Sequence, residues 1–243
     1  MSEQLGIDYF GRKHPLADLH NQTTLKYRRK IYHFLVEAIG GVEGKVILDH
    51  GSTPDTEREA SNCFIRWLVQ DQAQVRATSP EPIAHLAQAF PGVKVMDWPL
   101  QLASNETLDC VLSSAVIEHV GSQTDQVEYV RSLLQLGSPL LMTTPNRYHW
   151  LEFHTKLPLI HWLPRAWHRG LLKLIGKTFW ASESNLRLLS QQDFATVIDQ
   201  ALQHQALEVA ITWYQPKFLG MVSNLCIFIQ PTSQRESKVK AGE

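Results

Sequence analysis

An adjacent carboxylate and imidazole, Glu118 and His119, follow an apolar run in the stretch LDCVLSSAVIEHVG. Residues that come directly after a buried strand lie at a sheet edge, where α/β proteins bind their ligands. An imidazole at that edge can accept a proton from a substrate, and a neighbouring carboxylate can orient the ring or contact the substrate. His119 is therefore a candidate general base, with Glu118 as its catalytic partner. An equally open alternative is that the two residues only anchor their loop by hydrogen bonds.

A second polar stretch, ILDHGSTPDT at residues 47–56, contains a single glycine after an apolar run. Loops that hold a pyrophosphate usually need several glycines, so that backbone amides can converge on the phosphates. S-adenosylmethionine carries no phosphate, and its amino-acid end and hydroxyls need acceptors and one close backbone approach. Asp49 and Gly51 can supply these features, so the loop is compatible with S-adenosylmethionine. The structural alternative for Asp49 is a helix cap.

These residues need strands and helices that place them, and the chain alternates between the two. Short apolar runs indicate strands at residues 45–49, 73–78, 93–98, 108–114, 139–144, 207–213 and 224–230. Helical spacing of apolar residues indicates helices at 25–40, 56–70, 80–90, 125–136 and 190–203. Ser190 and Asp193 resemble a capping box at the start of the last helix. Such alternation predicts an α/β fold with a doubly wound, mostly parallel seven-stranded sheet.

The stretch from Pro145 to Glu183 breaks this alternation, because it is rich in proline, histidine and tryptophan. We expect one domain over residues 1–230, with a helical lid inserted at 145–185, after the fifth strand. The polar residues 231–243 are expected to form a disordered tail.

Composition excludes several classes of protein. The formal net charge of −1 and a pI near 6.8 predict no binding to nucleic acid. Cys63, Cys110 and Cys226 each lie in an apolar segment, which favours reduced thiols in the cytoplasm. The amino terminus lacks the pattern of a signal peptide, and no apolar stretch reaches the roughly 18 residues that span a bilayer. The sequence carries no signal of an oligomeric state.

The order of the motifs VILDHG, PEP, VMDW, LDCVLSSAVIEHVG and LLMTTPNR resembles the class I S-adenosylmethionine-dependent methyltransferases. The similarity is strongest to small bacterial enzymes related to quinone-biosynthesis methyltransferases. Its most specific pieces are residues 113–121 and 143–164. The resemblance implies a Rossmann-like methyltransferase fold.

The resemblance also implies roles for individual residues. It places Asp49 and Gly51 at the methionine end of the cofactor and Asp97 beside the adenine amino group. Ser114 then borders the methyl-transfer site. Glu81 is the nearest acid for the ribose hydroxyls, since VRATSPEP has none at the usual position.

Polar residues after the fifth strand are candidates for substrate binding. Arg147, beside Asn146, can hold an anionic group of the acceptor, with a surface ion pair as the alternative. Glu152 and His154 are further candidate substrate contacts. The histidines of this region are spaced by five, seven and seven residues, which matches no common metal-ligand pattern, so we expect no metal.

The segment 159–180 has the composition of a membrane-surface helix. Residues 153–182 hold five basic and no acidic residues, and four of the basic ones recur at every fourth position: Arg165, Arg169, Lys173 and Lys177. An apolar stripe accompanies them: Trp167, Leu171, Leu174 and Ile175. One interpretation is peripheral contact with the inner face of the membrane. The favoured interpretation is a plain lid whose stripe is buried against the sheet.

The sequence as a whole predicts methyl transfer from S-adenosylmethionine to a small-molecule or lipid-linked acceptor. A catalytically silent Rossmann-like binding module is the alternative, because the cofactor loop is sparse in glycine. A nicotinamide-dependent oxidoreductase is disfavoured, because LDHGST lacks the glycines that a pyrophosphate requires.

Overall fold

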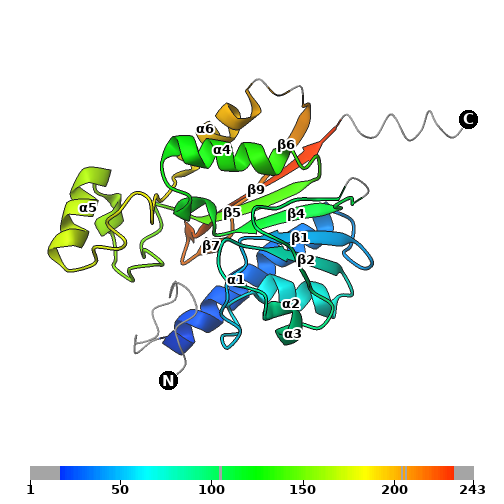
Figure 1. Cartoon of the computed structure of the whole chain (residues 1–243). Helices are drawn as coiled ribbons and strands as arrows, with labels where there is room; N and C mark the ends of the chain where they lie inside the picture. The colour runs from blue at the N-terminus through cyan, green and yellow to red at the C-terminus, as the bar shows by residue number, and fades with distance from the viewer. Residues whose placement is uncertain (1–16, 104–105, 204, 206, 233–243) are drawn as a thin grey trace, which may run out of the picture. The chain divides into compact units, whose positions relative to one another are not determined.

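The computed structural model describes residues 17–103, 106–203, 205 and 207–232 (Figure 1). The chain divides into two compact units, Met1–Ser114 and Ala115–Glu243. The part of the predicted tail from residue 233 onward lies outside the described residues. The single-domain prediction for 1–230 stays a prediction.

Four parallel strands form the sheet of the first unit: β1 (Val46–His50), β2 (Gln74–Thr78), β3 (Lys94–Val95) and β4 (Cys110–Ser114). β1 pairs with both β2 and β4, and β2 pairs with β3. Ile47 and Leu48 on β1 are fully buried, as expected for a strand covered on both faces of a parallel sheet.

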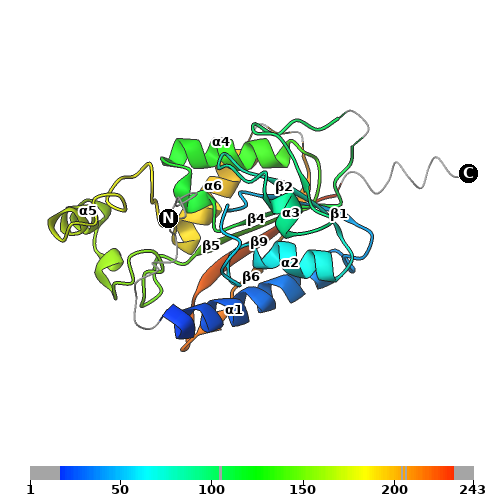
Figure 2. The same cartoon turned by 60° about the horizontal axis from the view of Figure 1, so that its bottom comes forward.

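Three helices pack in this unit: α1 (Ala17–Ala38), α2 (Cys63–Gln70) and α3 (Leu86–Ala89). α1 and α2 lie side by side in both views (Figures 1 and 2). Their contact includes the rings of Tyr32 and Trp67, whose centroids lie 5.4 Å apart. The Tyr32 hydroxyl also donates a hydrogen bond to Asp71 (2.5 Å), just past α2.

The second unit contains three long antiparallel strands: β5 (Leu140–Pro145), β6 (Val209–Tyr214) and β9 (Asn224–Pro231). β9 lies between the other two and runs antiparallel to both. A hairpin of β7 (Lys217–Phe218) and β8 (Met221–Val222) precedes β9.

The helices of this unit are η1 (Ile117–His119), α4 (Gln123–Leu134), η2 (Ile160–Trp162), α5 (Arg165–Leu174) and α6 (Gln191–Leu202). α4 and α6 lie side by side, whereas α5 lies apart from β5 and β9 in both views (Figures 1 and 2). The capping box predicted from Ser190 and Asp193 is confirmed, and Ser122 and Asp125 form a second one at α4.

The strand order is β3-β2-β1-β4-β5-β9-β6, which confirms the predicted seven-stranded α/β sheet. The largest differences from the predicted elements are in α2, which begins at Cys63 instead of residue 56, α3, which begins at Leu86 instead of residue 80, and β3, which covers two residues. Before α2, the Asp55 carboxylate accepts from the amides of Glu57 (3.0 Å) and Arg58 (3.4 Å). Such side-chain bonds to the backbone compete with helix formation.

Candidate functional site

The loop after β1 closes tightly onto the end of β2. Gly51 has a φ of +97°, a backbone conformation that glycine adopts without strain. Its amide donates to the carbonyl oxygen of Thr78 (2.8 Å), and the Ser52 amide donates to the same oxygen (3.3 Å). The only glycine of this loop therefore makes the turn that brings the backbone to the strand end.

Asp49 is a buried acid at the end of β1. Its carboxylate accepts from the Ser52 hydroxyl (3.2 Å). Burial raises the pKa of Asp49 to about 6, because the protein interior solvates the charged form poorly. A cationic ligand group beside it would favour the charged form, so Asp49 is suited to hold an ammonium.

Residues 53–62 form an ordered loop that is held by the side chain of Asn62. The sequence did not lead us to predict a role for this residue. Its side-chain oxygen accepts from the amide of Thr53 (3.1 Å), and its side-chain nitrogen donates to the carbonyls of Thr53 (2.7 Å) and Asp55 (3.1 Å). His85 donates to the carbonyl of Pro54 (2.7 Å). Asn62 has a φ of 51° just before α2, a conformation that asparagine tolerates. An asparagine inside the predicted helix 56–70 is therefore the sequence signal that could have indicated this turn.

All five residues predicted to bind cofactor belong to the strand ends of the first unit. Asp49 lies near the end of β1 and Gly51 directly after it, Glu81 and Asp97 follow β2 and β3, and Ser114 ends β4. Since these strands are parallel, their carboxyl ends share one edge.

Asp97 is exposed, and its backbone oxygen accepts from the Thr78 hydroxyl (3.1 Å). The neighbouring Trp98 was not predicted as a site residue. Its ring meets His50 edge to face, with centroids 5.4 Å apart, and the side chain keeps 47% of its surface exposed. An exposed indole beside Asp97 offers a flat surface for an aromatic base.

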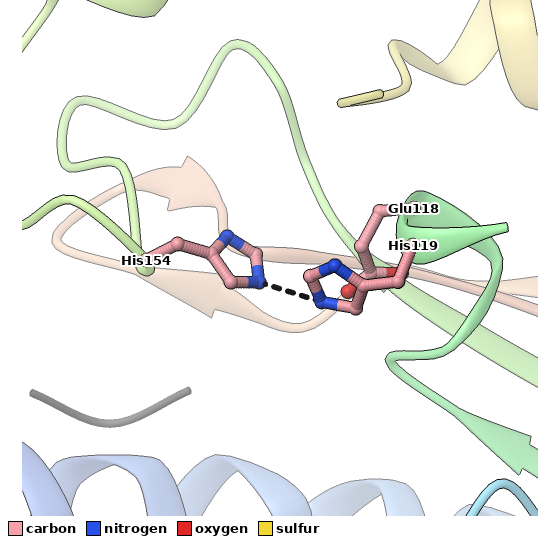
Figure 3. Close-up of side chains that lie close together, drawn as sticks. All are labelled: Glu118, His119 and His154. Atoms are coloured by element: carbon pink, nitrogen blue, oxygen red, sulfur yellow. Dashed lines mark hydrogen bonds between the residues drawn. The ribbon is translucent and has the colours of Figure 1, made fainter. Parts of the chain in front are cut away.

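In the second unit, His119 on η1 and His154, in the segment after β5, point toward each other (Figure 3). Their Nε2 atoms lie 3.1 Å apart, and their rings are nearly perpendicular, at 85°. The indole of Trp180 packs against both rings, with centroid distances of 6.0 Å to His119 and 5.1 Å to His154. The two histidines therefore form a pair, which we call the histidine pair.

The outer nitrogen of each ring is bound to an acceptor. His119 Nδ1 donates to the carbonyl oxygen of Asn185 (2.7 Å), and His154 Nδ1 donates to Oε1 of Glu152 (2.7 Å). A carbonyl and a carboxylate oxygen only accept, so both Nδ1 atoms carry hydrogen. In two neutral rings, the Nε2 lone pairs then face each other across 3.1 Å, which favours a shared proton or a metal cation between them.

Glu152 is buried and contacts His154 on the side of the ring that faces away from His119. Its carboxylate also accepts from the amides of His154 (2.8 Å) and Thr155 (2.5 Å). Burial acts to raise the pKa of Glu152, but His154 and these hydrogen bonds outweigh it and hold the pKa far below its usual range. Burial also lowers the pKa of His119 to about 3, with the neighbouring His154 acting in the same direction.

Glu118 is fully buried beside the histidine pair. Its Oε2 accepts from the Thr144 hydroxyl (2.9 Å), and its backbone oxygen accepts from the amide of Arg187 (2.7 Å). One oxygen of Glu118 and one ring nitrogen from each histidine all lie within 4.8 Å of one another. These three residues are therefore one cluster.

Residues that the sequence interpretation missed hold η1 in place. The side-chain nitrogen of Gln126 donates to the carbonyl of Ile117 (2.8 Å), and its oxygen accepts from the guanidinium of Arg187 (2.5 Å). Arg187 donates to Gln123 as well (2.9 Å). Gln126 and Arg187 are 61 positions apart, so no local pattern marks them as partners.

Asn146 and Arg147, predicted to bind substrate, are engaged with the backbone. Asn146 donates to the carbonyl of Val222 (2.9 Å) and accepts from the amide of Tyr148 (3.1 Å). Arg147 donates to the carbonyls of His161 (3.3 Å) and Leu163 (2.9 Å). The structure thus places both residues in contacts that fix the chain after β5.

The remaining histidines of the segment 145–185 do not join the cluster. His161 donates to the carbonyl of His149 (2.7 Å), and His149 itself contacts the backbone of Leu151. His168 is buried on α5. The potential metal ligands therefore combine one histidine of this segment with Glu118 and His119, which precede it in the chain.

α5 presents the predicted apolar stripe outward. Trp167 and Leu174 keep 72% and 83% of their surface exposed, and Ile175 is also exposed. Of the predicted basic ridge, Arg165 pairs with Asp193 (3.0 Å) and Arg169 with Glu183 (3.1 Å). The expectation that the stripe is buried is wrong for these three residues, because His168 and Leu172 occupy the inner face of the helix instead. That residues 145–185 form a lid stays a prediction.

No protein-family model and no curated protein matches this chain. Among solved structures, it is similar to the magnesium protoporphyrin IX methyltransferase ChlM from Synechocystis PCC 6803 with bound SAH. The two are 14% identical, with a TM-score of 0.52 over 89% of this chain and 85% of the other. The same enzyme with bound SAM gives 12% identity and a TM-score of 0.50, over 93% and 86% of the chains.

The methyltransferase domain of bacterial CtHen1-C is 11% identical, with a TM-score of 0.53 over 85% of this chain and 98% of that domain. At such identities, the likeness shows the fold. The predicted fold of class I methyltransferases is therefore confirmed.

Proposed function

We propose that this protein transfers a methyl group from S-adenosylmethionine to a small-molecule or lipid-linked acceptor. The observation that carries the proposal is the buried Asp49 beside the tight turn at Gly51, at the carboxyl edge of a sheet with the methyltransferase fold. Similar solved structures, at low identity, contain SAM or its demethylated product SAH.

In this proposal, the residues of the first unit recognise the cofactor by its chemistry. Asp49 accepts from the ammonium of the methionine part, and the backbone at Gly51 allows the close approach. Glu81 accepts from the ribose hydroxyls, and Asp97 from the adenine amino group. The exposed face of Trp98 packs against the adenine ring.

Methyl transfer is a displacement in which the acceptor atom attacks the methyl carbon in line with the breaking carbon–sulfur bond. Sulfur keeps the bonding electrons and leaves as the neutral thioether of SAH. An acceptor hydroxyl or amine must lose its proton. In this mechanism, Nε2 of His119 accepts the proton and passes it to Nε2 of His154 at 3.1 Å. Burial disfavours a charged His119, whereas the Glu152 carboxylate stabilises the charge on His154.

In this mechanism, Glu118 is a positioning residue that fixes the orientation of His119. Its carboxylate is held by Thr144 (2.9 Å), and its backbone by Arg187 (2.7 Å). This fixes η1, and with it the direction of the His119 ring.

The exposed face of α5 favours the lipid-linked acceptor. Its apolar side chains, Trp167, Leu174 and Ile175, lie in water, together with the exposed cation Lys173. A helix with exposed aromatic and aliphatic residues and nearby basic groups binds anionic lipid surfaces. Among the helices that the structure describes, none has the length and apolarity needed to cross a bilayer. We propose peripheral contact with an anionic membrane.

The test is transfer of radioactive methyl from labelled S-adenosylmethionine into a bacterial extract that is separated into lipid and water-soluble fractions. We expect label in the lipid fraction and formation of an equal amount of SAH, with both lost in Asp49→Ala. Label in the water-soluble fraction alone would overturn the lipid-linked acceptor. If the folded protein binds the cofactor but labels neither fraction, the silent binding module replaces the enzyme.

A further inference from the structure

The cluster of Glu118, His119 and His154 has the composition and spacing of a metal site (Figure 3). We propose that these three side chains bind one divalent transition-metal ion through the Nε2 atoms of both histidines and a carboxylate oxygen of Glu118. The binding itself is independent of the proposed methyl transfer. The role of the ion in the reaction, given below, rests on that function.

The distance between the two nitrogens fits a shared ion. Metal–imidazole bonds of about 2.0–2.1 Å, at tetrahedral or octahedral angles, separate two ligand nitrogens by roughly 2.9–3.4 Å. The Nε2 atoms of His119 and His154 lie 3.1 Å apart, within this interval. The rings come from two segments of the second unit and converge with these nitrogens foremost (Figure 3).

The tautomers of His119 and His154 are also those of metal-binding histidines. A histidine that binds metal through Nε2 carries hydrogen on Nδ1, and it usually donates this hydrogen to a carboxylate or a backbone carbonyl. His154 donates to Glu152 (2.7 Å), and His119 donates to the carbonyl of Asn185 (2.7 Å). Both hydrogen-bond arrangements that orient metal-binding histidines are thus present, one on each ring.

Charge favours a cation at this place. Glu118 and Glu152 are both buried, and Glu152 lies behind His154. Buried carboxylates need nearby positive charge or strong donors, since burial removes their hydration. A divalent ion between the rings would lie next to Glu118 and attract Glu152 through the His154 ring.

The donor set selects the class of ion. Imidazole nitrogens suit Zn²⁺, Cu²⁺, Fe²⁺ or Ni²⁺, whereas Mg²⁺, Ca²⁺ and Mn²⁺ prefer oxygen ligands. Three protein ligands leave coordination positions open, as in catalytic sites. With the ion bound, neither Nε2 atom could accept a proton, so the ion would replace His119 as the group that activates the acceptor. An acceptor oxygen at an open position would lose its proton to water more easily, because the positive charge stabilises the anion.

The experiment measures Co²⁺ binding to the full chain after removal of metals with a chelator. Visible absorption reports Co²⁺ bound by nitrogen ligands, and elemental analysis after gel filtration gives the number of ions per chain. We expect one ion per chain, with binding lost in His119→Ala and His154→Ala and retained in His33→Ala, an exposed histidine on α1.

Glu152→Gln tests the hydrogen bond behind His154. The glutamine keeps the size and an accepting oxygen but loses the charge, so we expect Co²⁺ affinity to fall about 10- to 100-fold while the protein stays folded. Circular dichroism shows whether each variant folds.

Absence of Co²⁺ from the folded wild-type protein would overturn the proposal and leave a proton-sharing histidine pair. Co²⁺ that stays bound to both alanine variants would also overturn it, because the ion would then lie elsewhere. Calorimetry with S-adenosylmethionine on the metal-free protein separates this failure from a failure of the proposed function.

Discussion

His119 and His154 approach each other through Nε2 while each ring donates its Nδ1 hydrogen outward, to Asn185 and Glu152 respectively. Two neutral rings cannot hydrogen-bond in this arrangement, since neither Nε2 carries a hydrogen. The approach of the two nitrogens is therefore favourable only when a proton or a metal ion lies between them. A shared proton and a bound metal ion are both compatible with a site that activates an acceptor. Only the second predicts that the protein binds added metal ions at this pair.

Asp49 should make the protein less stable as pH rises. Its pKa is raised by burial from 3.8 to about 6, so the folded state holds a proton that the unfolded state has lost between these values. Stability is greatest below about pH 4 for this group and declines until about pH 6, by about 3 kcal/mol at most. Urea unfolding between pH 4 and pH 7 measures this decline, with Asp49→Asn as the comparison.

We expect Asp49→Asn to be the more stable protein at pH 7 and to bind S-adenosylmethionine more weakly. If the variant unfolds at lower urea concentrations than the wild type at pH 7, burial of the charge is not the dominant effect at this position.

Asn62 should control the shape of the loop at residues 53–62. Asn62→Ala removes three hydrogen bonds to the loop backbone and places alanine at a positive φ, so we expect a loss of about 2–4 kcal/mol. Asn62→Gly removes the same bonds but accepts the backbone conformation. If glycine and alanine variants unfold at the same denaturant concentration, backbone strain contributes nothing. If neither differs from wild type, the loop does not depend on Asn62.

Asn146 should act on stability more than on substrate affinity. The side chain donates to Val222 and accepts from Tyr148, so Asn146→Ala is expected to cost about 1–3 kcal/mol of unfolding free energy. Denaturant unfolding gives this value, and Asn224→Ala provides an asparagine control on β9. A variant with unchanged stability and lost methyl transfer would instead support the substrate-binding role predicted from the sequence.

The outward face of α5 should bind anionic vesicles. We expect co-sedimentation with phosphatidylglycerol vesicles at low salt, weaker binding to phosphatidylcholine vesicles, and loss of binding in a Trp167→Ser, Leu174→Ser double variant. Because both side chains are exposed, thermal stability should change little. Equal sedimentation of wild type and double variant would exclude this face as the contact.

The sequence predicted the elements whose signals are local. Alternating apolar runs indicated the strands, and the Ser190–Asp193 spacing indicated the cap of α6. The start of α2 could not be read in this way, because Asp55 and Asn62 hold the preceding residues in a loop by bonds that helix periodicity does not reveal.

The cluster around His119 depends on a contact between distant parts of the chain, which the sequence did not predict. Glu118 and His119 were recognised together as a candidate base and its partner, whereas His154 was recognised separately, as a candidate substrate contact. The two histidines are 35 positions apart in the chain, and ligand patterns in a sequence capture only residues that are closer to one another, so their contact is hidden. Their meeting depends on η1, held by Gln126 and Arg187, and on the chain after β5, held by Asn146.

Titration calorimetry with the purified wild-type protein measures whether the chain binds S-adenosylmethionine. We expect saturable binding of one molecule of S-adenosylmethionine or SAH per chain, weakened in Asp49→Ala and Asp97→Ala and unchanged in Glu43→Ala, an exposed acid ahead of β1. If the folded wild-type protein does not bind, or if both aspartate variants bind as tightly as the wild type, the cofactor site does not lie at these residues.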